Sequence, residues 1–294
     1  MVNDKGLWNP WSLQFENQAW EKQFSGQAKA ISARNDVIGV VMGWLGVLGC
    51  LNETKMYIGF HHRTILSIVG FVIYPLLGFL WWKQRGSYSR SRKPLLFTAR
   101  ILIPLHSAWL LFEMNKPMNP TMKEVFGRIF LESPISMLVG MTFWHSLPFK
   151  SMFFQHSFSL VLSSPWMLGF CRTCSETPLA SGQIKVIGDV FDTVSTLVFN
   201  AVGLPIVRMS EWYTCLGVSA YAHVSLGWLV PLFLTYQVEL SSRGRFLRSV
   251  VHSREQRSVD EAQSTYRHHS FQVFGFMVVI LWPLIVFLAP LCSG

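Results

Sequence analysis

The sequence predicts an all-α fold, a polytopic bundle of transmembrane helices with seven crossings, and six or eight crossings as the alternatives. Three observations lead to this prediction. Charged residues make up only 14% of the chain, against roughly 25% in a typical soluble domain. Apolar residues form blocks, most of them near the ~20 residues that a helix needs to cross a bilayer. Basic residues gather in the segments between blocks, as they do on the cytoplasmic side of membrane proteins.

The chain divides into an N-terminal segment and one transmembrane domain. Residues 1–36 are polar but rich in aromatic side chains, which predicts a segment that lies at the membrane interface. Residues 37–294 are predicted to form the transmembrane domain. Its apolar blocks cover residues 37–51, 65–82, 95–112, 129–147, 152–170, 184–207, 212–236 and 271–291. The first block is short for a crossing, because its helix would span only about 22 Å.

Two basic loops set the predicted topology. Loop 83–93 holds five basic and no acidic residues, and loop 237–270 holds six arginines. If both are cytoplasmic, an even number of crossings separates them, yet five apolar blocks lie between. One of the five therefore does not cross. We predict that it is 184–207, which contains two aspartates, and the rival is 152–170, which contains Gln155, His156, four serines and Pro165.

This topology carries expectations about location and partners. The protein is expected in the plasma membrane or an endomembrane. All five cysteines then lie at or near the exterior or lumenal face, where disulfides persist. Anionic lipid is a candidate partner of the basic residues in loop 83–93, namely Arg85, Arg90, Arg92 and Lys93. The net charge of +9 is explained by the loops, so no nucleic-acid partner is expected. No cofactor and no metal are expected.

The acidic block contains the most distinctive polar pattern. Its polar residues recur at steps of three, four and four, which puts them on one helical face: Asp189, Asp192, Thr196 and Asn200. Carboxylates at membrane depth are costly and usually face a cavity or pathway, where they could bind a cation, relay protons or stabilise a carbocation. The alternative is an interfacial helix whose polar face simply meets water.

Other polar residues within the blocks are weaker candidates. Arg128 and Glu132 have i, i+4 spacing, which suits a pathway or a structural ion pair. His106 and His223 lie in the middle of separate blocks. They could face one another as ligands of a haem or metal, although a single histidine bonded to a neighbouring helix is the simpler interpretation. The Cys171-x-x-Cys174 pair favours a local disulfide or free thiols over zinc.

The pattern narrows the function without fixing it. No Walker loop, dinucleotide fingerprint or Gly-x-Ser-x-Gly motif occurs, and block 271–291 has no lysine for a retinal Schiff base. Every block after the first that is predicted to cross contains a proline, and kinked helices with buried polar groups suit a solute or ion pathway. We therefore expect a small transporter or channel. The alternatives are a membrane enzyme acting on a lipid or isoprenoid through intramembrane carboxylates, and a receptor-like or scaffolding protein.

Overall fold

The computed structural model describes residues 9, 12–28, 133–144, 147–199, 210–251 and 256–288, with separate short stretches between Asp36 and Ile129. The described residues form helices and no β-sheet, which confirms the all-α prediction. In chain order these are η1 (Val69–Ile73), α6 (Pro134–Trp144), α7 (Phe149–Ser163), α8 (Trp166–Ser175), α9 (Pro178–Phe199), α10 (Glu211–Val224), η3 (Ser225–Leu229), α11 (Val230–Val250) and α12 (Gln256–Leu288). A further helix, not labelled, covers residues 18–28.

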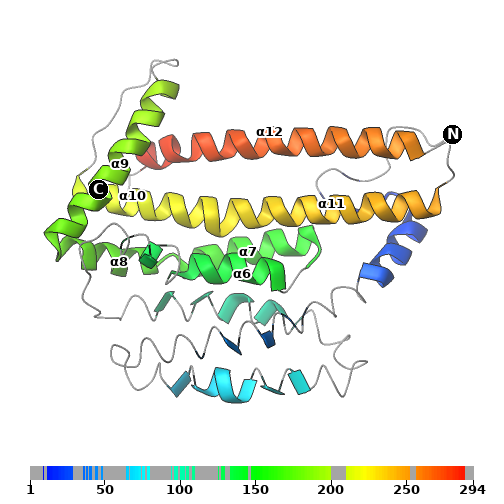
Figure 1. Cartoon of the computed structure of the whole chain (residues 1–294), viewed down its shortest axis with the longest axis horizontal. Coiled ribbons are helices and arrows are strands. Elements are labelled where there is room, and N and C mark those ends of the chain that lie inside the picture. Colours follow the sequence, from blue (N-terminus) through cyan, green and yellow to red (C-terminus); the bar gives the residue numbers. More distant parts are fainter. Residues whose placement is uncertain are drawn as a thin grey trace.

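One long helix and its antiparallel neighbour dominate the structure (Figure 1). α10, η3 and α11 form a continuous helix of 40 residues, Glu211–Val250, which is about 60 Å long at 1.5 Å per residue. We call it the long helix. α12 runs back beside it. The basic segment 237–270 thus contains the end of α11 and the start of α12, and we call this antiparallel pair the hairpin.

Membrane spans in the described residues follow from length and composition. Two helices are long and apolar enough to cross a bilayer, Glu211–Val250 and Gln256–Ile285. Each is longer than the ~30 Å hydrocarbon core requires, because each combines an apolar half with a polar half. Blocks 37–51, 65–82 and 95–112 lie mostly outside the described residues. The number of crossings therefore stays a prediction.

α7 and α8 run antiparallel to the long helix. At one end, the Phe149 N–H donates a hydrogen bond to Glu239 of α11, and at the other end Cys171 of α8 is bonded to Cys215 of α10. The two short helices meet at Pro165. Proline cannot donate the backbone hydrogen bond that would continue α7, so the helix ends at Ser163 and restarts. Block 152–170 therefore forms an interrupted helix that lies alongside the long helix.

α9 lies in a different direction from the other helices. It starts at Pro178, because a proline is well tolerated in the first turn, and it is steeply inclined to α10, α11 and α12 (Figure 1). It crosses α10 closely at Gly188, where a Cβ atom would come within 2.4 Å of the Thr214 methyl group. A hydrogen bond of 2.9 Å from Ser181 to Glu211 ties the start of α9 to the start of α10.

Candidate functional site

A buried polar cluster lies where α7 passes the middle of the long helix, and His223 is at its centre. The Nδ1 atom of His223 accepts a hydrogen bond of 3.1 Å from the indole N–H of Trp166. Its Nε2 atom then carries the proton and donates to the backbone oxygen of Leu160, 3.1 Å away. Both ring nitrogens are occupied, and His223 thereby connects α10 to α7 and α8.

His156 of α7 belongs to the same cluster and is only 2% exposed. It is hydrogen-bonded to the backbone of Gly227 in η3. The Gly227 carbonyl can accept because Pro231, four residues later, has no N–H to donate to it. Among the described residues the Nε2 atom of His156 has no hydrogen-bond partner, so the bond is made by Nδ1. A neutral imidazole has a single N–H, and Nε2 therefore presents a bare lone pair inside the protein.

The cluster extends along α7 on both sides of His156. Gln155 is buried, and its Oε1 atom has no hydrogen-bond partner in the part of the chain that the structure describes. Ser159 is also buried and donates a hydrogen bond of 2.7 Å to the backbone oxygen of Arg100. The buried Arg100 side chain contacts the Met152 sulfur at 2.7 Å. One stretch of α7 thus carries three polar side chains into the protein interior.

The cluster has the chemistry to bind a small polar species. A buried polar atom without a partner costs about 1–3 kcal/mol, and such atoms mark places where water or a ligand binds. The lone pair of His156 selects species that donate a hydrogen bond. The neighbouring η3 is a π-helical turn, a feature that recurs at functional sites. His223 and Gly227 also lie near the middle of apolar block 212–236, far from either end.

The acidic face of α9 lies apart from this cluster. The Asp189 side chain is exposed. Asp192 accepts a hydrogen bond of 3.1 Å from the indole N–H of Trp282, which ties α9 to α12. The Thr196 hydroxyl donates to the Asp192 backbone oxygen within the same helix. Asn200 lies outside the described residues. Asp192 is therefore a helix-to-helix contact, and Asp189 faces the surface.

The Asp192 contact leads to a stability prediction. Asp192→Ala removes the acceptor of the Trp282 N–H and should destabilise the protein by about 1–3 kcal/mol. Asp192→Asn keeps an acceptor oxygen, and Asp189→Asn alters an exposed group, so each should change stability by no more than about 0.5 kcal/mol. Thermal unfolding in detergent measures all three. Equal losses from Asp189→Asn and Asp192→Ala would contradict the assignment.

The remaining candidates from the sequence are only partly described. Arg128 is a buried residue in a short helical stretch before α6. Glu132 and His106 lie outside the described residues, so the proposed pairs Arg128–Glu132 and His106–His223 stay predictions. The basic loop 83–93 also lies outside them, with Arg85, Arg90, Arg92 and Lys93.

Cys171 forms a long-range disulfide, whereas the Cys171-x-x-Cys174 spacing favoured either a local disulfide or two free thiols. Cys171 forms a disulfide with Cys215, 44 residues later, with a Cα–Cα distance of 5.7 Å. Cys174 is buried and is not disulfide-bonded. Of the two alternatives that the spacing favoured, the local Cys171–Cys174 bond is not formed, because tertiary packing brings α10 against α8 and Cys171 pairs with Cys215. Cys50 and Cys292 lie outside the described residues.

In the sequence alone, Gln155 and His156 indicate only that block 152–170 is costly to place in a bilayer. The spacing rule that drew attention to α9 applies equally to α7. Gln155, Ser159 and Ser163 recur at steps of four, and the structure buries all three. Applying the rule to both blocks would have identified the α7 face.

A second polar cluster joins the N-terminal segment to the hairpin, and we call it the clamp. Arg243 of α11 is 3% exposed and donates to both carboxylate oxygens of Glu21, at 2.6 and 3.1 Å. It also donates to Glu239 at 2.9 Å. Its guanidinium lies 4.9 Å from the Phe15 ring centre and 4.4 Å from that of Phe24, within range of cation–π attraction.

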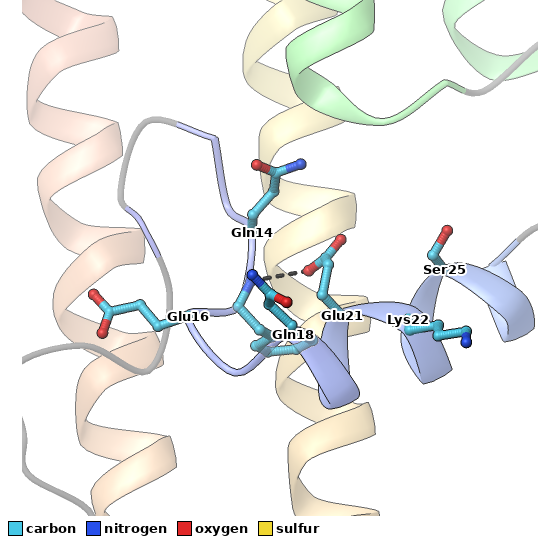
Figure 2. A pocket seen from close by; sticks show the side chains of 7 residues that line it. Gln14, Glu16, Gln18, Glu21, Lys22 and Ser25 are labelled. Atoms are coloured by element: carbon cyan, nitrogen blue, oxygen red, sulfur yellow. Dashed lines mark hydrogen bonds between the residues drawn. The ribbon is translucent and has the colours of Figure 1, made fainter.

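The N-terminal segment is shaped to reach this arginine. Leu13 adopts a left-handed backbone conformation, with φ of 55°, and is fully buried. The Phe15 N–H donates to Glu21 at 2.9 Å (Figure 2). An open depression of about 550 Å³ lies on the outer side of the segment. Its lining consists of Gln14, Phe15, Glu16, Gln18, Glu21, Lys22 and Ser25.

The geometry of Glu21 has an electrostatic consequence. Burial alone would raise the pKa of this carboxyl group. The hydrogen bonds from Arg243 and from the Phe15 N–H, together with the arginine charge, outweigh burial and lower the pKa below its ordinary value. Glu21 is therefore ionised at neutral pH, and the clamp is a fully charged contact.

Comparisons with known proteins identify no relative. No protein-family model, curated protein or solved structure matches the chain.

Proposed function

We propose that the chain is a multi-pass integral membrane protein that moves a small solute or ion across the bilayer through the polar cluster of α7, α10 and η3. The observation that carries the proposal is the polar interior beneath an apolar surface. Large apolar side chains are exposed along α12 and α7, including Phe276, Ile280, Phe154 and Phe158. Exposed apolar areas of this kind fit lipid far better than water.

The clamp supports seven crossings by parity. It joins residues 12–28 to the hairpin, so both must lie on the same side of the membrane. An even number of crossings then separates residue 28 from residue 237. Seven apolar blocks lie between these residues, so the number of crossings is even, at six, if block 184–207 does not cross. The steep inclination of α9 agrees with a helix that does not span the bilayer (Figure 1). The hairpin is then cytoplasmic, and α12 provides the seventh crossing.

The disulfide supports the same orientation. Cys171 and Cys215 lie at the end of the bundle opposite to the arginine-rich hairpin. Disulfides persist in the exterior or a lumen, whereas the cytoplasm keeps thiols reduced. The proposed topology therefore assigns each end of the long helix to the compartment that suits its chemistry.

The transport proposal has its support at the middle of the long helix. Pro231 leaves the Gly227 carbonyl without its helical donor, and His156 binds that carbonyl. The second ring nitrogen of His156 has no partner among the described residues. Interrupted helices with polar groups near the bilayer midplane are the usual binding sites of transporters. The enzyme alternative has less support, because Asp189 is exposed and Asp192 is bonded to Trp282.

Flux through liposomes tests the proposal. Purified protein in sealed liposomes should speed the entry of protons, measured with an entrapped pH-sensitive dye, or of glycerol or urea, measured by light scattering. His156→Ala should change the accelerated rate several-fold, because it removes the unpaired acceptor and the Gly227 contact. His269→Ala, at an exposed position of α12, should leave the rate unchanged.

Two outcomes would overturn parts of the proposal. Folded protein, checked by circular dichroism, that accelerates none of the three probes would reject transport of this class of solute. Acceleration that is equal in wild type and His156→Ala would retain transport but reject the polar cluster as its path.

A further inference from the structure

The apolar and polar halves of the hairpin helices meet at one level. Block 212–236 ends just before Gln237, and block 271–291 begins just after Ser270. Gln237 donates a hydrogen bond of 2.6 Å to Ser270, so these two boundaries are side by side. If the apolar halves cross the bilayer, as the proposed function requires, this pair marks the start of the headgroup layer.

Most arginines of the described hairpin have carboxylate partners. Arg243 is bonded to Glu21 and Glu239 in the clamp. Arg248 lies 2.7 Å from Asp260, and Arg257 lies 3.1 Å from Glu261. These contacts neutralise three of the positive charges within the protein itself.

Arg245 and Arg267 differ, because each contacts only a serine hydroxyl within the described part of the chain. Arg245 lies 3.4 Å from the Ser242 hydroxyl, and Arg267 lies 3.2 Å from the Ser241 hydroxyl across the hairpin. Both arginine side chains are exposed. They therefore carry two uncompensated charges beside adjacent serines of α11.

Their position is close to the proposed headgroup layer. Arg267 is three residues from Ser270, which is about 5 Å along a helix. Arg245 is eight residues from Gln237, or about 12 Å, and its contact with Ser242 turns it back toward the boundary. Arginine side chains of this length can reach phosphates that lie just outside the hydrocarbon core.

We propose that Arg245 and Arg267, with the hydroxyls of Ser241 and Ser242, bind the phosphate of an anionic lipid in the cytoplasmic leaflet. Arginine suits this ligand, since its planar guanidinium donates two parallel hydrogen bonds to phosphate oxygens. The serine hydroxyls can donate further hydrogen bonds once the arginines turn to the phosphate. This inference depends on the membrane placement proposed above but not on transport.

The test compares two double variants of the full chain in neutral detergent. Arg245→Gln with Arg267→Gln removes the unpaired charges, and the control, Arg248→Gln with Arg257→Gln, removes the same charge from paired positions. Binding of fluorescent phosphatidylglycerol is titrated for each. Affinity should fall about ten- to thirty-fold in the first variant, as expected for two basic residues at a membrane surface. The control should stay within a few-fold of wild type.

Several outcomes would overturn the inference. Equal losses in both variants would show a general charge effect, and no loss in either would show that the pair binds no lipid. Equal competition by free glycerol phosphate or by polyglutamate would replace the lipid by a soluble anion or an acidic protein. Extraction of the wild-type chain from membranes by alkali would instead reject the membrane placement. Unchanged flux of the first variant in liposomes would show that transport does not depend on the lipid site, so the two proposals can fail independently.

Discussion

Replacing both Cys171 and Cys215 by serine is expected to lower the free energy of unfolding by about 4 kcal/mol. The disulfide closes a loop of 44 residues, and closing a loop of this size restricts the unfolded chain by roughly that amount. The loop contains α9 and the connection to α10, so the loss should be largest at this end of the bundle. Unfolding in mixed micelles with increasing dodecyl sulfate measures the difference, with matching results from reduction of the wild type.

Cys174 provides the control for the disulfide prediction. It is buried three residues from Cys171 and is not disulfide-bonded, so Cys174→Ser changes one sulfur to oxygen without opening a loop. A loss of about 1 kcal/mol or a little more is expected from burying the hydroxyl. If Cys174→Ser costs as much as the double variant, or if thiol labelling finds Cys171 reduced, the assigned pairing is wrong.

Arg243→Met should have the second largest effect, a loss of about 2–3 kcal/mol. Removing one partner of a buried ion pair typically costs ~3–5 kcal/mol, because the other charge is left behind in the protein. Here Glu21 is 26% exposed, so water can partly replace the arginine and the expected loss is smaller. Thermal unfolding and protease cleavage within residues 12–28 should both report it.

A matched arginine tests whether the clamp, rather than charge in general, is responsible. Arg257 is bonded to Glu261, but both side chains are largely exposed, at 89% and 69%. Arg257→Gln should therefore change stability by no more than about 0.5 kcal/mol. Release of the N-terminal segment by Arg257→Gln and not by Arg243→Met would contradict the role of the clamp.

The clamp should also make stability depend on pH. In the folded protein the pKa of Glu21 is lower than its ordinary value, so the contact with Arg243 stabilises the protein at neutral pH. As the pH falls, the stability of the folded protein begins to decrease near the ordinary pKa, where Glu21 of the unfolded chain takes up a proton. The stabilisation by the clamp is fully lost once the pH is below the lowered pKa of the folded protein. Introduced into the wild type, Glu21→Gln should reduce the dependence of the free energy of unfolding on pH in the acidic range. Introduced into Arg243→Met, the same change should have no such effect.

The sequence predicted the helices better than their contacts. Apolar blocks of bilayer length and prolines are local signals, and they correctly indicated the apolar halves of the long helix and α12. The disulfide and the clamp are not local. Cys215 is 44 residues from its partner, and Arg243 is 222 residues from Glu21, so neither pairing leaves a pattern in any short window.

The buried polar cluster was not predicted from the sequence, and the reason is different. From the sequence, Gln155 and His156 predict a costly crossing, but that prediction assumes that they face lipid. In the folded chain both are buried, and His156 faces η3, where Pro231 leaves the Gly227 carbonyl available to it. A proline on one helix and a histidine on another are complementary, and only their juxtaposition reveals it.

The separation of the clamp partners also sets an order of assembly during synthesis. Ribosomes add about 5–20 residues per second, so Arg243 follows Glu21 by roughly 10–45 s. The disulfide partners, only 44 residues apart, are made within seconds of one another. Through that interval Phe15 and Phe24 lack the Phe246 ring against which they finally pack. The N-terminal segment is therefore made well before the part of α11 against which it docks, and its aromatic side chains stay without that partner until α11 has been synthesised.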